Sequence, residues 1–133
     1  MLFPANGPSA SQILPQHQDL SVGDWILDGP PEADCHFEVE LLEPNKMMVL
    51  RSTSHLPPQV RDNDRGRMLW TWSFHLEETS AGKTRLLFRM RGDLEPWWLS
   101  LLYQLLIVPA DFIMGRSFCL GLKKRVERSR QTR

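Results

Sequence analysis

Few residues in this 133-residue chain have the types and spacing that chemistry at a protein site requires. The histidines stand at positions 17, 36, 55 and 75, which is not a ligand-like spacing, and Cys35 and Cys119 lie far apart. None of the motifs GxGxxG, GxSxG, HExxH and CxxC occurs, and there is no phosphate-binding P-loop. The sequence therefore indicates no metal, no cofactor and no catalytic residue set.

Three polar residues remain as candidates for orienting a bound molecule. Asp111 stands one place from an apolar stripe, where a carboxylate caps a helix, pairs with an arginine such as Arg116, or anchors a ligand. His55 lies between a strand and a proline-containing loop, which places it either at the mouth of a cavity or in a structural role. Acid–base catalysis needs a titratable group that faces the substrate. Only Asp111 and His55 qualify, and neither has an evident orienting partner in the sequence.

The segment from Trp97 to Val126 carries apolar residues at steps of three and four, which places them on one face of a long helix. This stripe consists of Trp98, Leu101, Leu105, Val108, Phe112, Gly115, Cys119, Leu122 and Val126. Pro109 should cause a kink or a restart, and in a restart Asp111 would lie in the favourable first turn. We expect a buried core helix, because the apolar run before Asp111 is shorter than the roughly 20 residues of a membrane span. A true span and interfacial membrane contact are the alternatives.

Five stretches ahead of this helix are predicted to be β-strands, at residues 22–27, 35–42, 47–52, 68–76 and 84–92. The turn Glu43-Pro-Asn-Lys46 makes the second and third a hairpin, and alternation puts Phe37, Val39 and Leu41 on one face. The loop 54–67 is polar and is expected to lie outside the core. The fold class is therefore α+β, an antiparallel sheet packed on a long C-terminal helix, which either packs solid or encloses a cavity.

Sixteen basic residues balance sixteen acidic ones, which argues against a nucleic-acid partner. The charge is uneven, since residues 123–133 hold six basic residues against Glu127 alone. That basic end is either a solvated helix end that the macrodipole favours, or a contact for anionic lipid or nucleic acid. The two cysteines read as buried free thiols and no secretory signal is visible, which indicates a cytoplasmic protein.

Three segments carry a family resemblance: Met48-Val-Leu-Arg-Ser-Thr53, Trp70-Thr-Trp-Ser-Phe74 and Pro109-Ala-Asp-Phe-Ile-Met114. Following a Gly-Pro-rich turn in this order, they resemble the START-like superfamily, also called SRPBCC, which includes polyketide cyclases, Bet v 1-like proteins and lipid-transfer domains. The resemblance covers about residues 8–128 and is closest to uncharacterised bacterial members. It implies a helix-grip fold, a curved antiparallel sheet around the C-terminal helix with an apolar cavity between them. The chain then divides into an irregular segment 1–21, a START-like domain 22–128 and a basic tail 129–133.

The chain departs from that family at its start. Family members open with a strand and two short helices before the region that begins here near Pro8. The fold is therefore expected to be N-terminally truncated, with an unpaired sheet edge that favours a homodimer or aggregation. A misassigned translation start, a partner chain over the gap and a reduced domain are three competing explanations.

The leading functional hypothesis is a non-enzymatic binding module for a small hydrophobic or amphipathic molecule, lipid- or polyketide-like, held between sheet and helix. The cavity lining is predicted to be Leu50, Trp70, Trp72, Phe74, Phe88, Met90, Trp98, Leu101, Leu105 and Phe112. Asp111, Arg116 or His55 would orient the polar end of the ligand. The alternatives are a cyclase- or dehydratase-type enzyme and a membrane-associated protein that uses residues 97–115.

Overall fold

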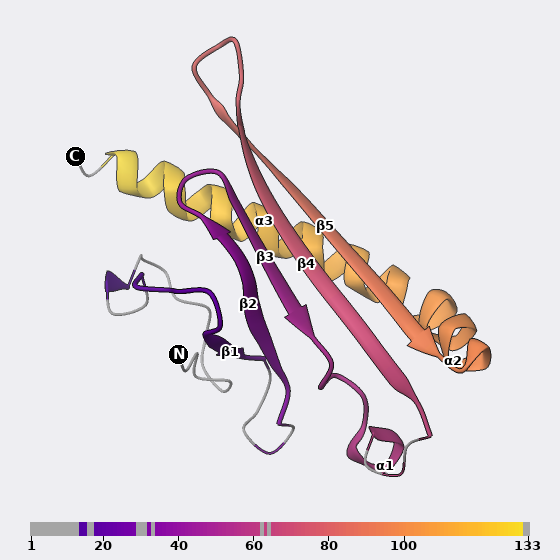
Figure 1. Ribbon diagram of the computed structural model, residues 1–133. Helices are drawn as coiled ribbons and strands as arrows, with labels where there is room; N and C mark the ends of the chain where they lie inside the picture. The colour runs from indigo at the N-terminus through magenta and orange to yellow at the C-terminus, as the bar shows by residue number, and fades with distance from the viewer. Residues whose placement is uncertain are drawn as a thin grey trace.

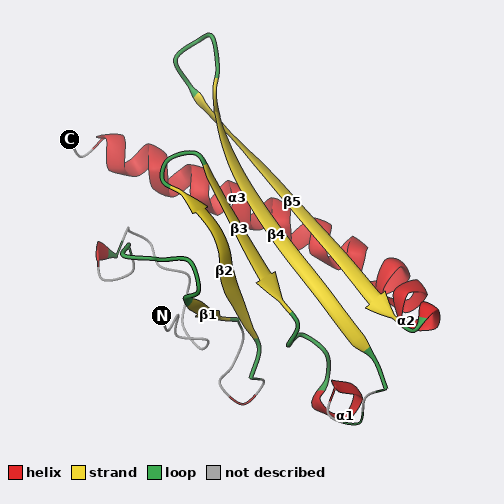
Figure 2. Ribbon diagram, in the orientation of Figure 1, coloured by secondary structure: helices red, strands yellow, loops and turns green. Residues whose placement is uncertain are grey.

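The computed structural model describes residues 14, 15, 18–28, 32, 34–61, 63 and 65–131. These residues form one five-stranded antiparallel sheet followed by a long C-terminal helix, so the fold is α+β (Figures 1 and 2). Most of the irregular segment predicted over residues 1–21, including His17, lies outside the described residues.

The sheet is a simple meander in which each strand pairs with the next along the chain. Its strands are β1 (Trp25–Leu27), β2 (His36–Glu43), β3 (Met47–Ser52), β4 (Arg67–Glu78) and β5 (Thr84–Glu95). All five predicted strands are present, although β1 has three residues where six were predicted. The predicted β2–β3 hairpin is confirmed, and its turn closes with a 3.0 Å hydrogen bond from the Lys46 amide to the Glu43 carbonyl.

A β-bulge in β2 changes which leucine faces inward. The register between β2 and β3 shifts between Val39 and Leu41, so that Leu42, and not Leu41, lies opposite the inward-facing Met48. The predicted alternation is therefore wrong at Leu41, because a bulge adds one residue to one strand and reverses the alternation beyond it. Leu42 then packs against the core.

The core lies at the end of the sheet where β5 leads into the C-terminal helix. It consists of Phe37, Val39, Leu50, Leu56, Met68, Trp70, Leu94 and Leu99. The prediction that the loop 54–67 lies outside the core is wrong at Leu56, which is buried, and at Val60, which packs on the core from the short helix α1 (Pro58–Arg61).

The C-terminal helix crosses one face of the sheet (Figure 1). It begins with α2 (Trp97–Leu102), passes through the π-helical turn η3 (Tyr103–Ile107) and continues as α3 (Val108–Gln131). The helix does not restart at Pro109, because the backbone stays helical from Leu102 through the π turn to Val108. The irregularity expected near Pro109 is this π turn, after which Pro109 is the second residue of α3 and Asp111 lies in its first turn. Proline lacks an amide hydrogen and its ring collides with the carbonyl four residues earlier, which accounts for the wide turn just before it. Because α3 extends to Gln131, the first residues of the predicted tail are helical.

The first half of the predicted buried stripe is exposed. Trp98, Leu101, Leu105 and Val108 are all exposed, and Phe112 is 70% exposed. The residues that face the sheet in this half are instead Leu99, Tyr103 and Asp111. In the second half of the predicted stripe Gly115 is buried, Cys119 and Leu122 are partly buried, and Val126 is exposed. The prediction assumed an uninterrupted α-helix, whereas the π turn adds a residue and keeps Tyr103 and Asp111 on one side despite their separation of eight.

These burial values make a stability prediction. Phe37 is 2% exposed and contacts the rings of His55, Trp70 and Trp72, so Phe37→Ala should lower the free energy of unfolding by about 3–5 kcal/mol. Phe112→Ala removes the same side chain from an exposed site and should change it by less than about 0.5 kcal/mol. Urea denaturation followed by circular dichroism measures both, and an equal loss in the two variants would contradict the exposed position of Phe112.

Candidate functional site

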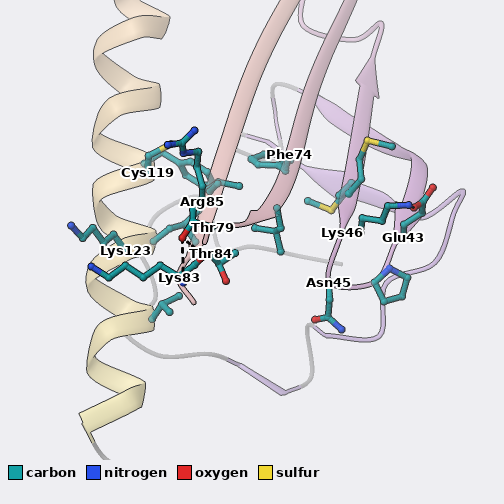
Figure 3. A pocket seen from close by; sticks show the side chains of 18 of the residues that line it. Glu43, Asn45, Lys46, Phe74, Thr79, Lys83, Thr84, Arg85, Cys119 and Lys123 are labelled. Atoms are coloured by element: carbon teal, nitrogen blue, oxygen red, sulfur yellow. Dashed lines mark hydrogen bonds and ion pairs between the residues drawn. The ribbon is translucent and has the colours of Figure 1, made fainter. Parts of the chain in front are cut away.

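A groove of about 1220 Å³ lies between α3 and the turn-bearing end of the sheet (Figure 3). In an antiparallel meander every second turn lies at the same end of the strands. The β2–β3 turn and the β4–β5 turn therefore reach the same end of the molecule. The C-terminal half of α3 forms the opposite wall. Three segments that are distant in sequence therefore meet around one depression.

The walls of the groove are mainly apolar. Their apolar residues are Leu42, Met47, Met48, Phe74, Leu76, Leu86, Phe118, Cys119, Leu120, Leu122 and Val126. Phe74 and Phe118 begin an aromatic cluster that continues into the sheet, with ring centroids 6.0 Å apart and with Phe88 stacked on Phe74 at 4.7 Å. The groove thus starts where the aromatic filling between helix and sheet ends.

The groove carries five basic residues and two acidic ones. Lys46 forms an ion pair with Glu43 at 2.7 Å, and Lys123 forms one with Glu127 at 3.8 Å. Lys83, Arg85 and Arg116 also line the groove, and within the described residues they make no ion pair. The rim therefore has excess positive charge, contributed by both hairpins and by α3, as the labelled side chains in Figure 3 illustrate.

The predicted lining is only partly at this groove. Phe74 and Arg116 line it. Leu50 and Trp70 are instead packed in the core, and Trp72 packs against the core from the same face. The expected lining by Trp98, Leu101, Leu105 and Phe112 is wrong, because these side chains are exposed on the outside of the helix.

Phe88 and Met90 contact the helix rather than the groove. Gly115 lies so close to β5 that a Cβ there would be 3.1 Å from Met90 Cε and 3.3 Å from Phe88 Cε1. A second close contact lies nearer the start of the helix, where a Cβ on Gly92 of β5 would be 3.0 Å from the ring of Tyr103. The helix is therefore held to the sheet at two points, each of which depends on a glycine.

The predicted anchor Asp111 lies at neither the groove nor the surface. It is 7% exposed, and its Oδ2 accepts a 3.1 Å hydrogen bond from the Tyr103 hydroxyl. Burial raises the pKa of the Asp111 carboxyl, and the Tyr103 hydrogen bond opposes that rise. Burial and the nearby carboxylate raise the pKa of Tyr103 to about 12. The partner of Asp111 is therefore Tyr103, which was not among the alternatives of a helix cap, a pair with Arg116 or a ligand anchor.

This burial predicts a pH dependence. Because the pKa of Asp111 is raised in the folded chain, its contribution to stability is full below the unfolded pKa of about 3.9 and is lost as pH rises through the folded value. Asp111→Asn removes that loss. The free energy of unfolding of the variant, relative to the unsubstituted chain, should therefore increase between about pH 3.5 and pH 7. Urea melts at both pH values measure it, with the exposed Asp93→Asn as control, and a flat difference for Asp111→Asn would contradict the assignment.

His55 lies in a hydrogen-bonded series that resembles a catalytic triad in composition. Its Nδ1 is 2.6 Å from Ser52 Oγ, and its Nε2 is 3.1 Å from Asp28 Oδ2. Ser52 is 3% exposed, and its Oγ also accepts from the Ser54 amide and contacts the Ser54 hydroxyl. A nucleophile must reach its substrate, and neither His55 nor Ser52 lines the groove. His55 therefore does not lie at the mouth of this groove, and the hydrogen bonds through Ser52, His55 and Asp28 connect β3 to the end of β1.

If the hydrogen bonds between Ser52, His55 and Asp28 are structural, the loss of the Ser52 hydroxyl should destabilise the fold. Ser52→Ala leaves the buried Ser54 amide and one nitrogen of His55 without a partner, which should lower the free energy of unfolding by about 1–3 kcal/mol. The control is Ser73→Ala, because Ser73 makes only an exposed 3.4 Å hydrogen bond to the Arg89 carbonyl. Thermal and urea denaturation compare the two, and an equally small effect of both would show that the series is not structural.

Several groove residues were not predicted as lining. Lys83 lies in the β4–β5 turn, Met48 and Leu86 lie on β3 and β5 close to the two turns, and Phe118 lies on α3. The predicted order of strands could have indicated this end of the sheet, because a five-strand meander brings its second and fourth turns to the same end of the strands.

No protein-family model matches the chain, and no curated protein or solved structure was found to match it. The described fold and groove therefore define a class only at the level of an α+β protein with a partly open apolar groove between sheet and helix.

Proposed function

We propose that the chain is a binding module for a small amphipathic molecule with an anionic end. The observation that carries this proposal is the apolar groove with a basic rim between the hairpins and α3. Its volume of about 1220 Å³ exceeds the roughly 300–1,000 Å³ of most small-molecule sites, so it offers room for a chain or a fused-ring ligand.

Burial of apolar ligand surface would supply most of the affinity. Each 100 Å² removed from water is worth about 2.5 kcal/mol, before the cost of immobilising the ligand. Phe74 and Phe118 offer flat ring surfaces at the floor, and Met47 and Met48 offer adaptable side chains beside them. Such walls favour aliphatic or aromatic groups of varied shape.

The rim favours a negative charge at one end of that ligand. Lys83, Arg85 and Arg116 have no ion-pair partner within the described residues, so an incoming carboxylate or phosphate would not have to displace one. Exposed basic groups also raise the local concentration of an anionic ligand. The polar anchor is therefore assigned to Arg116 and the two hairpin cations rather than to Asp111.

Binding is a better account of the groove than catalysis. No histidine is among the described residues that line it, and its two carboxylates, Glu43 and Glu127, are each paired with a lysine. A cyclase- or dehydratase-type reaction would need an available acid or base that faces the substrate. The order of elements, a sheet followed by a long helix with an apolar space between them, supports a helix-grip fold of the START-like kind.

The two cysteines allow a direct test. Cys119 lines the groove, whereas Cys35 is distant from it, and burial raises the pKa of the Cys35 thiol. Palmitate, an anionic amphiphile, should slow alkylation of Cys119 by iodoacetamide and leave the rate at Cys35 unchanged. Hexadecanol, which lacks the charge, should protect Cys119 less. Equal protection of both cysteines, or of neither, would overturn the proposal.

A charge variant tests the rim. Arg116→Gln should weaken palmitate binding by about three- to tenfold, because a charge-assisted hydrogen bond at an exposed site is lost. Arg89→Gln, on the outer face of β5, is the matched control and should bind as the unsubstituted chain does. Titration by isothermal calorimetry measures both, and native mass spectrometry of detergent-free protein would show which molecule co-purifies.

A further inference from the structure

The first half of the C-terminal helix exposes an unusually large apolar surface. Between Trp97 and Met114, a stretch that the structure describes in full, eleven large apolar side chains are exposed. Gln104 is the only exposed polar side chain in that stretch. We call this surface the apolar collar. By length and composition the helix from Trp97 to Ser129 is long and apolar enough to cross a membrane, and 11% of its most apolar stretch is buried.

The apolar collar covers the sides of the helix that the sheet leaves free, rather than forming one stripe. The four consecutive residues Leu105, Leu106, Ile107 and Val108 are all exposed, and consecutive helical residues project to different sides. A partner helix covers a stripe about 100° wide, so a second copy of this chain would leave much of the collar in water. Lipid hydrocarbon can contact all the exposed sides of the helix that are inserted into it. The distribution of exposed apolar side chains therefore fits lipid better than a protein partner.

The opposite end of the same helix is cationic. Residues 123–133 hold six basic residues against Glu127 alone, and Lys124 is exposed. The pair Trp97 and Trp98, both exposed, stands at the start of the collar, and tryptophan favours the boundary between headgroups and hydrocarbon. An exposed apolar half followed by a basic half complements a surface that is apolar inside and anionic outside.

We propose that this helix docks in the plane of an anionic lipid bilayer, with the apolar collar inserted and the basic end among the headgroups. An in-plane position follows from the sheet, since Tyr103 and Gly115 hold one side of the helix against β5, and Asp111 is buried on that side with a hydrogen bond to Tyr103. A spanning helix would carry that side, with the exposed Arg89 and Arg91 of β5, into the hydrocarbon, where charge is costly. The apolar collar lies outside the groove, and of the basic residues at the end of the helix only Lys123 also lines it within the described residues. The docking does not depend on a bound ligand.

Vesicle flotation tests the docking. The full chain should bind vesicles of phosphatidylcholine with roughly 30% phosphatidylserine about tenfold more strongly than phosphatidylcholine alone, and about 0.5 M salt should reduce that preference. The double variant Leu106→Glu/Ile113→Glu should lose at least tenfold in binding. Its sites are 61% and 67% exposed, so the fold does not require them, and circular dichroism checks that it is kept.

The control is Leu87→Glu, which places one carboxylate at an exposed leucine on the outer face of β5 and should leave vesicle binding unchanged. Equal binding by the double variant and the unsubstituted chain would overturn the proposal. So would carbonate-resistant binding, which indicates a span, or a dimer by light scattering that the double variant makes monomeric without any vesicle binding. Protection of Cys119 by palmitate is measured in the absence of vesicles. Failure of the ligand-binding proposal and failure of the membrane-docking proposal can therefore be distinguished.

Discussion

The narrow contact between the C-terminal helix and β5 is the constraint on which the rest of the molecule depends. Two glycines create it: Gly92 on the strand accepts the ring of Tyr103, and Gly115 on the helix accepts Phe88 and Met90. The Tyr103–Asp111 hydrogen bond lies between these two points. A helix that is apolar on nearly every side has no preferred face by hydrophobicity alone, so local shape and one buried polar pair decide which side meets the sheet.

That contact has two consequences at opposite ends of the helix. Toward its start only the line through Leu99, Tyr103 and Asp111 meets the sheet, and the remaining apolar side chains stay uncovered. Beyond Gly115 the helix and the hairpin ends are separated by the groove, whose floor is set by Phe74 and Phe118. One docking geometry therefore leaves an apolar exterior in one half and an apolar recess in the other.

The sheet could be predicted from the sequence, whereas the packing of the helix could not. Alternation on β4 and β5 and the turn at Glu43–Lys46 are local signals, and they led to the observed strands. The spacing of Trp98, Leu101, Leu105 and Phe112 also predicted a helix. Because apolar residues lie on most sides of this helix, steps of three and four can be found on several of its faces and do not identify the buried one. The π turn before Pro109 then changed which side of the helix packs against the sheet. Of the two partners of His55, Ser52 is three residues away, but Asp28 lies 27 residues away in the chain and carries no local signal.

The arrangement of charge separates the surfaces of the molecule that can associate from those that cannot. Edge strands recruit other strands unless charged side chains discourage it, and the long edge strand β5 carries Arg89 and Arg91 on its outer face. The apolar collar has no such protection, since Gln104 is its one exposed polar side chain. Contiguous apolar surface of that kind is rarely left in water by a monomeric protein. The helix exterior, rather than the sheet edge, is therefore the surface where an external partner would remove the largest unfavourable contact with solvent.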